Sequence, residues 1–248
     1  MKIAVAGATG RVGRHTADVL EERGHEVVRM SRTTGVDVIS GEGLEDALLG
    51  VQSIVDAATG PSPDQDAATR FFTTSARNLQ AAGDRAGVER IVVVSIVATD
   101  RYSGGYGVAK VAHEQVLQAG PVPALVLHAT QFHEFVEQLM QWGTRDGAVH
   151  LPRMQTQLVA ARAVGEALAD LATGTSNAPM SEIGGPRAER LAEMAALLAS
   201  RNGGTRIEEL PVDPDDPDSV LMAEGGLLPG PDAILAGPTF EEWLSQSR

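Results

Sequence analysis

Cysteine is absent from the 248-residue chain, so disulfides, thiolate nucleophiles and cysteine-based zinc sites are excluded. Long apolar segments are absent as well. The longest, residues 91–98, is interrupted by Ser95 and is much shorter than the roughly 20 residues that a membrane-spanning helix needs. No apolar signal core precedes Gly7. We therefore expect a soluble cytoplasmic protein that does not associate with membranes.

Basic residues are scarce relative to acidic ones. The chain has 20 Lys and Arg against 33 Asp and Glu, which gives a formal net charge of −13. A surface this acidic repels phosphate backbones and anionic lipid headgroups, so we expect no nucleic-acid partner. The composition leaves the oligomeric state open.

The first half of the chain alternates short runs rich in Val, Ile and Leu with longer segments of helical periodicity. This order is typical of βαβ units, and runs without polar alternation are typical of strands covered on both faces. The sequence therefore predicts an α/β fold with a doubly wound parallel sheet. The predicted strands cover residues 2–6, 26–30, 36–39, 53–57, 90–95 and 124–129.

Beyond residue 130 the pattern is less regular. Helices are predicted over 132–141, from 161 to a stop at Gly174, and over 188–200, with a strand near 157–160 and a loop over 211–218. Thr239 and Glu242 form the capping box of a last helix. Because no linker separates the two halves, we predict one domain, 1–248, in which residues 130–248 form a small C-terminal cap on the substrate side.

A glycine-rich loop follows the first predicted strand and opens the first predicted helix. Small residues let the backbone approach a pyrophosphate, and the helix N-terminus offers free N–H groups to it. The alternative is a tight glycine turn without a ligand. The residues predicted to hold a dinucleotide here are Gly7, Thr9, Gly10, Arg11, Val12 and Gly13.

The residues after the second strand indicate which dinucleotide is bound. Sites selective for NAD hold the ribose with an acidic side chain, but this chain has Ser31 and Arg32 there. Arg32 could pair with a 2′-phosphate, as could Arg11, which favours NADP; otherwise Arg32 is a solvated side chain. Asp37 could accept a hydrogen bond from the adenine amino group, or it could be a turn residue.

Only two tyrosines occur, and one of them, Tyr106, stands four residues before Lys110. On a helix both side chains share a face, and a neighbouring cation lowers the pKa of a phenol. Such a tyrosine can give a proton to a substrate oxygen. Ser95, at the end of its strand, could orient the substrate carbonyl. The alternative is a chance spacing on an exposed helix.

Together these motifs resemble the short-chain dehydrogenase/reductase superfamily, especially its atypical NAD(P)H-binding branch with the NmrA-like proteins. The resemblance continues through residues 129–133, 182–186, 229–231 and 239–244. It implies a Rossmann-type core that binds NADP(H), with Tyr106 as acid/base, Lys110 on the nicotinamide ribose and Ser95 as third catalytic member. It also implies that the cofactor is lined by Ala57, Ala58 and Thr59.

Two departures from that branch are visible. His128 stands where the branch commonly has arginine, and the gap from Ser95 to Tyr106 is only 11 residues, which makes Thr99 an alternative to Ser95. For the substrate wall we predict Phe132, His133 and Trp142, although such residues are as often core packing.

No histidine has the spacing of a metal site, so none is predicted. The function predicted from these residues is an NADP-dependent oxidoreductase that reduces a small carbonyl or quinone-like substrate. The alternatives are a non-catalytic NADP sensor and a non-redox lyase or isomerase.

Overall fold

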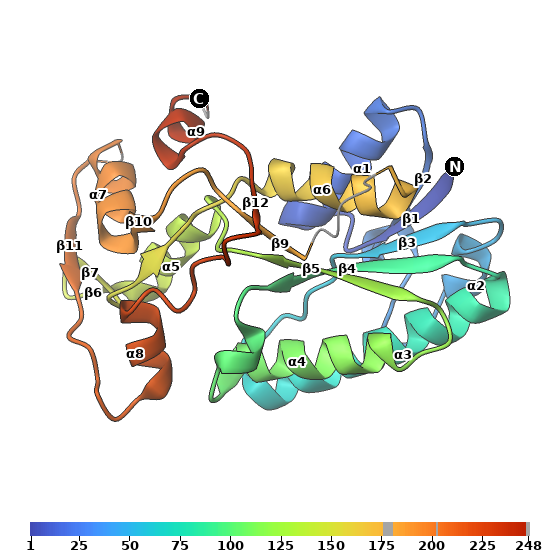
Figure 1. The fold of residues 1–248 in the computed structure, drawn as a ribbon, viewed down its shortest axis with the longest axis horizontal. Coiled ribbons are helices and arrows are strands. Elements are labelled where there is room, and N and C mark those ends of the chain that lie inside the picture. Colours follow the sequence, from blue (N-terminus) through green and yellow to red (C-terminus); the bar gives the residue numbers. More distant parts are fainter. Residues whose placement is uncertain (176–180, 202, 247–248) are drawn as a thin grey trace.

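The computed structural model describes residues 1–175, 181–201 and 203–246. Its centre is a seven-stranded sheet in the order β12-β9-β5-β4-β3-β1-β2, with every neighbouring pair parallel (Figure 1). The α/β doubly wound fold class is thereby confirmed. The strands are β1 (Lys2–Ala6), β2 (Glu26–Met30), β3 (Ser53–Asp56), β4 (Arg90–Ile96), β5 (Ala124–Ala129), β9 (Glu182–Gly184) and β12 (Ile234–Leu235).

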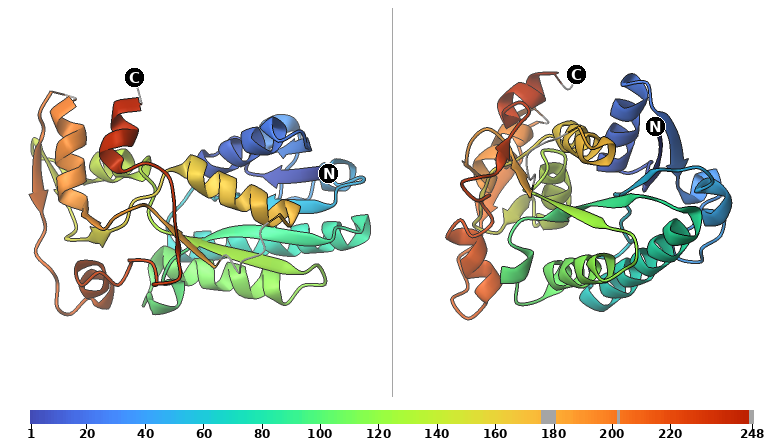
Figure 2. Two further views of the ribbon diagram at one scale, coloured as in Figure 1. Left: turned by 45° about the horizontal axis from the view of Figure 1, so that its top comes forward. Right: turned by 45° about the vertical axis from the view of Figure 1, so that its right-hand side comes forward.

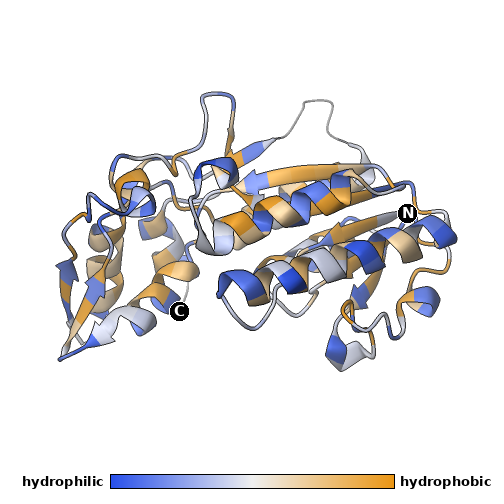
Figure 3. Ribbon diagram, turned by 90° about the horizontal axis from the view of Figure 1, so that it is seen from below, coloured by the Kyte–Doolittle hydropathy of each residue, from blue (hydrophilic) through white to orange (hydrophobic). Residues whose placement is uncertain are grey.

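Helices cover both faces of this sheet. One face is packed by α1 (Arg11–Glu22) and α6 (Ala161–Thr173), and the other by α3 (Gln65–Ala86) and α4 (Gly105–Gln118), as Figure 2 shows. The short α2 (Leu44–Ala47) packs against α3. Figure 3 shows hydrophobic colours along the strands and alternating colours along the flanking helices. This is the pattern expected where strands are covered twice and each helix buries one stripe.

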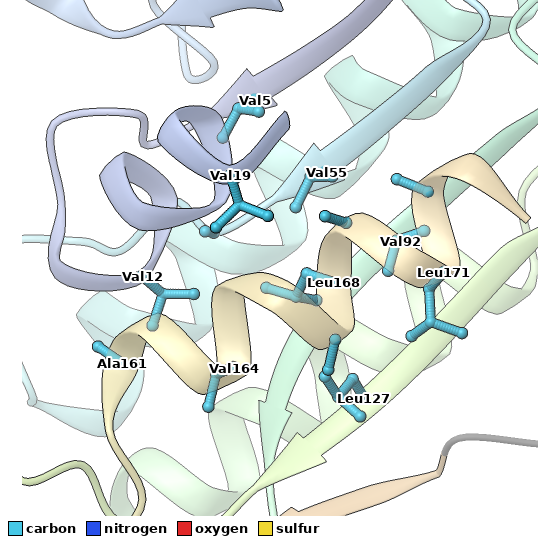
Figure 4. Close-up of a cluster of buried hydrophobic side chains, with 14 of the residues drawn as sticks. Val5, Val12, Val19, Val55, Val92, Leu127, Ala161, Val164, Leu168 and Leu171 are labelled. Carbon is cyan, nitrogen blue, oxygen red and sulfur yellow. The ribbon is translucent and has the colours of Figure 1, made fainter. Parts of the chain in front are cut away.

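The core between α1, α6 and the sheet is built from branched aliphatic side chains (Figure 4). Val5, Val55 and Val92 project from three adjacent strands toward Leu168 of α6, and all four side chains are buried. Burying one such side chain stabilises the fold by roughly 1.5–3 kcal/mol. This packing fixes α6 across the strands whose carboxyl ends carry the candidate site.

The predicted third strand, residues 36–39, is wrong. The Asn78 side-chain amide on α3 donates to the carbonyl oxygens of Val38 and Ile39, both at 2.9 Å, and the Asp37 carboxylate accepts the Ile39 N–H at 2.7 Å. These groups are therefore used in a turn rather than in a ladder, and the sheet ends at β2.

The strand β2, at the end of the sheet, carries charged side chains that are paired with the neighbouring helix and strand. Arg29 lies 2.6 Å from Asp18 and 2.9 Å from Glu21 of α1, and Glu26 lies 3.2 Å from Lys2. These contacts attach the last strand to the layer above it.

The rest of the chain forms a smaller lobe with its own hydrophobic cluster. The loop before α4 contacts this lobe: the Ser103 N–H donates to Asp218 at 2.8 Å, and Arg101 donates to the Gly226 carbonyl at 3.0 Å. The lobe contains α5 (Phe135–Gly143), β6 (Thr144–Arg145), β7 (Ala148–Leu151), β8 (Gln155–Thr156), β10 (Glu189–Arg190), α7 (Leu191–Arg201), β11 (Arg206–Glu209), α8 (Pro217–Ala223) and α9 (Phe240–Gln246).

Two predictions for this half need correction. The strand expected near 157–160 is reduced to an isolated bridge between Val159 and Phe132, and the loop expected over 211–218 ends in α8. The capping box is confirmed, because Thr239 Oγ1 accepts the Glu242 N–H at 3.2 Å. No helix within the described residues is long and apolar enough to span a bilayer.

We expect Leu168→Ala to lower the free energy of unfolding by about 2–5 kcal/mol, because it leaves a cavity between α6 and the sheet. Urea denaturation followed by circular dichroism measures this loss. Leu49→Ala removes the same atoms from a side chain that is 64% exposed, so it should change stability by less than about 0.5 kcal/mol. Equal losses in the two variants would contradict this account of the core.

Candidate functional site

The order of the strands has a switch point at the carboxyl ends of β1 and β3. The chain leaves β1 for β2 on one side and returns to β3 on the other, so the loops after β1 and β3 separate around this point. In open α/β sheets ligands bind at such a switch point.

The glycine loop after β1 is packed too closely for a side chain at Gly7 and at Gly13. Gly7 has φ +73°, and a Cβ there would lie 2.6 Å from the Ala57 carbonyl oxygen. A Cβ on Gly13 would collide with the Gly7 carbonyl oxygen. The helix α1 then begins at Arg11, with Gly10 at its N-cap and no side chain capping it. The backbone N–H groups of its first turn therefore remain available to an anion.

The predicted nucleotide-selecting residues lie next to this loop. The N–H groups of Gly7 and Ala8 both donate to the Met30 carbonyl, at 3.0 and 3.3 Å, so the end of β2 is attached to the loop. Ser31 directly follows and caps the short helix η1 (Arg32–Thr34), which leaves Arg32 exposed. Asp37 belongs to the turn described above.

Some of the other predicted cofactor residues are buried, and the others are exposed. Val12, Ala57 and Ala58 are buried, so a ligand would meet mainly their backbone. Thr9 and Thr59 are exposed.

Tyr106 and Lys110 lie on one face of α4, and both contact Phe72 of α3. The Tyr106 ring meets Phe72 edge-on at 5.5 Å, and Lys110 Nζ lies 4.5 Å from the centre of the same ring. Gln65, at the start of α3, accepts the Gly105 N–H at 2.8 Å. The start of α4 is therefore attached to the helix that follows the loop after β3.

The expected effect of Lys110 on the phenol is wrong in direction. Burial raises the pKa of Tyr106 to about 12 instead of lowering it. The reason is where the ammonium points: Lys110 Nζ donates to the Val94 carbonyl at 2.9 Å and to His113 at 3.0 Å. Burial lowers the pKa of Lys110 itself to about 8.

Ser95 and the alternative residue, Thr99 in η2 (Thr99–Arg101), contact the same carboxylate. Ser95 Oγ donates to Glu114, and Thr99 Oγ1 lies 3.5 Å from the same oxygen. The other Glu114 oxygen lies 3.2 Å from His128 Nε2. Sequence reasoning missed Glu114, although it follows Lys110 by four residues and therefore shares its helix face.

The Glu114–His128 pair favours the charged form of each partner. The hydrogen bond to Glu114 raises the pKa of His128. Burial alone raises the pKa of Glu114, but hydrogen bonds from His128 and Ser95 outweigh it, and the net direction is downward. The pair sits where β4 and β5 are in register, since Ser95 lies opposite His128.

The three residues predicted for the substrate wall pack against different partners. His133 is buried beside the rings of Phe240 and Trp243, both at 5.4 Å, and its Nε2 lies 3.0 Å from the Pro238 carbonyl. Phe132 packs against the core under α6. Trp142 is 57% exposed. Substrate contact by these residues stays a prediction.

Comparison with known proteins identifies the fold. No protein-family model and no curated protein matches the chain. Among solved structures, MoeE5 in complex with UDP-glucuronic acid and NAD is 18% identical with a TM-score of 0.75, and the match covers 100% of both chains. A dTDP-4-dehydrorhamnose reductase from Clostridium acetobutylicum is 14% identical with a TM-score of 0.69, over 86% of this chain and 84% of that one.

A UDP-glucuronic acid 4-epimerase from Bacillus cereus, in complex with UDP-glucuronic acid and NAD, is also similar. It is 13% identical with a TM-score of 0.69, over 99% of this chain and 97% of that one. The chain has the Rossmann-like fold of these proteins.

We expect His128→Gln to cost more stability at about pH 5.5 than at about pH 8.5, by about 1 kcal/mol. The folded pKa of His128 is raised, so its contribution is complete below the unfolded pKa and is lost as the pH rises through the folded pKa. Glu114, whose pKa is lowered, stays ionised at the lower pH. Urea denaturation at the two pH values gives the difference.

His25→Gln serves as the control for this measurement. Burial lowers the pKa of His25, so its removal should carry no extra cost at the lower pH. A pH-independent cost for His128→Gln would show that no ion pair forms with Glu114.

Proposed function

We propose that this protein is a cytoplasmic NADP(H)-dependent oxidoreductase of the short-chain dehydrogenase/reductase superfamily, in its atypical NmrA-like branch. Its substrate is a small carbonyl or quinone-like compound. Two observations support the proposal: Tyr106 and Lys110 pack on the same ring, Phe72, at the start of α4, and Gly7 and Gly13 in the loop after β1 leave no room for a side chain. The fold shared with NAD complexes supports it.

The residues present fit a dinucleotide. The cradle formed by Gly7 and Gly13 and the uncapped start of α1 suit a pyrophosphate. Arg32 and Arg11 suit a 2′-phosphate, since both are exposed and Ser31 and Arg32, rather than an acidic residue, directly follow β2. Lys110 is proposed to hold the nicotinamide ribose, and Asp37 is kept as a candidate for the adenine. When bound, the nicotinamide supplies a hydride.

Tyr106 is suited to donating a proton. With a pKa raised to about 12, its phenol keeps its proton at neutral pH and can deliver it from Oη to a carbonyl oxygen. This favours the direction of reduction. Ser95 gives its own proton to Glu114, so it would have to release this hydrogen bond before it could donate to a substrate carbonyl.

A second candidate is an epimerase-like isomerase, which the likeness to the UDP-glucuronic acid 4-epimerase favours. It would form product without a net change in the nicotinamide. A non-catalytic sensor remains the third reading, and the presence of both Tyr106 and Lys110 counts against it.

We expect Tyr106→Phe to reduce kcat by about 10²–10⁴-fold, because the proton donor is lost while the ring still packs on Phe72. The assay follows NADPH absorbance against a panel of carbonyl and quinone substrates. Tyr102→Phe is the matched control, because Tyr102 is the chain's other tyrosine and packs across Gly107. Full turnover by Tyr106→Phe on a genuine substrate would falsify the proposed proton route.

We expect NADPH to bind more tightly than NADH, and Arg32→Ala to weaken NADPH about tenfold while leaving NADH unchanged. Fluorescence titration gives both dissociation constants. The control, Arg206→Ala, makes the same charge change on β11, where the side chain is 72% exposed. It should alter neither dissociation constant. Equal affinity of the native protein for the two nucleotides would refute the NADP assignment.

A further inference from the structure

A chain of three buried ionisable groups runs from α4 down to β3. Lys110 Nζ lies 3.0 Å from His113 Nδ1, and His113 Nε2 lies 3.0 Å from Asp56 Oδ2. The residues are 5%, 1% and 1% exposed, respectively. Neither His113 nor Asp56 has a part in the function proposed above, yet burying such groups is costly unless each hydrogen bond is made.

With Lys110 protonated, the donors and acceptors in this chain can be ordered in only one way. An ammonium has no acceptor, so His113 Nδ1 must accept from Lys110. The imidazole proton is then on Nε2, and Asp56 Oδ2 accepts it. The other Asp56 oxygen accepts the Ala58 N–H at 3.1 Å. Asp56 therefore determines the His113 tautomer, and that tautomer is the one that can hold Lys110.

Charged or polar groups and one aromatic ring face Lys110 from the elements that pack on it. Asp56 faces it from β3, the Val94 carbonyl from β4, and Glu114 from its own helix. On β5, His128 pairs with Glu114, and on α3 the neighbouring group is the Phe72 ring. Burial lowers the pKa of Lys110, and Asp56 and Glu114 oppose that shift.

We propose that His113 and Asp56 are positioning residues that keep Lys110 protonated and directed for the cofactor. The inference rests on the proposed function, because it takes Lys110 as the residue on the nicotinamide ribose. Asp56 fixes the tautomer of His113, and His113 in that tautomer holds the ammonium beside Phe72.

Asp56→Asn reverses this order without changing the shape of the side chain. The asparagine oxygen keeps the Ala58 N–H, so its amide donates to His113 Nε2 and moves the imidazole proton to Nδ1. Nδ1–H then faces the Lys110 ammonium, donor against donor. We expect Lys110 to lose its proton or to turn away.

The first test is ¹⁵N NMR of the histidine side chains in the ligand-free protein. His113→Gln assigns the signal, which is feasible because the chain has six histidines. We expect the native His113 to be neutral with the proton on Nε2, and Asp56→Asn to shift the proton to Nδ1. A native His113 protonated on Nδ1, or a tautomer that Asp56→Asn leaves unchanged, overturns the proposal.

If circular dichroism shows that Asp56→Asn does not fold, Lys110→Met provides a second variant for the NMR test. Without the ammonium, which together with burial lowers the pKa of His113, the imidazole beside Asp56 should accept a second proton at a higher pH. An unchanged His113 titration in Lys110→Met overturns the proposal.

The second test measures NADPH affinity by fluorescence titration across pH. We expect Asp56→Asn and His113→Leu to weaken NADPH about tenfold at neutral pH. His113→Gln should retain most of the affinity, since its amide oxygen can accept from Lys110 while its amide nitrogen donates to Asp56. In the two damaging variants, we expect the loss of affinity with rising pH to begin at a lower pH.

The two tests separate the possible failures. If the native protein binds no NADPH, the proposed function fails, and the NMR result still decides whether Asp56 sets the tautomer. If the native protein binds NADPH and Asp56→Asn binds it equally well at every pH, the positioning role is overturned while the proposed function stands.

Discussion

The buried ammonium of Lys110 is the constraint around which the centre of the molecule is arranged. A charge with 5% exposure needs compensation from several directions, and the structure supplies it from Asp56, Glu114 and the Val94 carbonyl. These partners lie on β3, α4 and β4, so they connect the helix to two adjacent strands of the sheet.

Much of the fold was predictable, because buried parallel strands leave continuous apolar runs in the sequence. The strands β9 and β12 have three and two residues, too few for such a signal. The wrong strand at 36–39 has suitable residues, but Asn78 on a distant helix takes two of its carbonyl groups. The start of helix α8 has a sequence signal, an N-cap Asp216 followed by Pro217. The acidic composition of the segment obscured this signal.

The candidate site was predictable only where its residues follow one another along the chain. The glycine loop and the pair of Tyr106 and Lys110 are local patterns. Asp56 and His113 are 57 residues apart, and only the docking of α4 above β3 joins them. The pKa of Tyr106 was misjudged for the same reason, because the direction of the Lys110 side chain depends on partners that spacing does not reveal.

The sheet ends at β2, so one row of backbone amides and carbonyls is left without a neighbouring strand. Open rims of this kind invite edge-to-edge aggregation when they are flat and apolar. Here the edge strand carries Arg29 and Glu26, which form ion pairs with residues of α1 and β1. An incoming strand would have to desolvate these charges. Paired charges on an edge strand of this kind oppose the addition of a further strand.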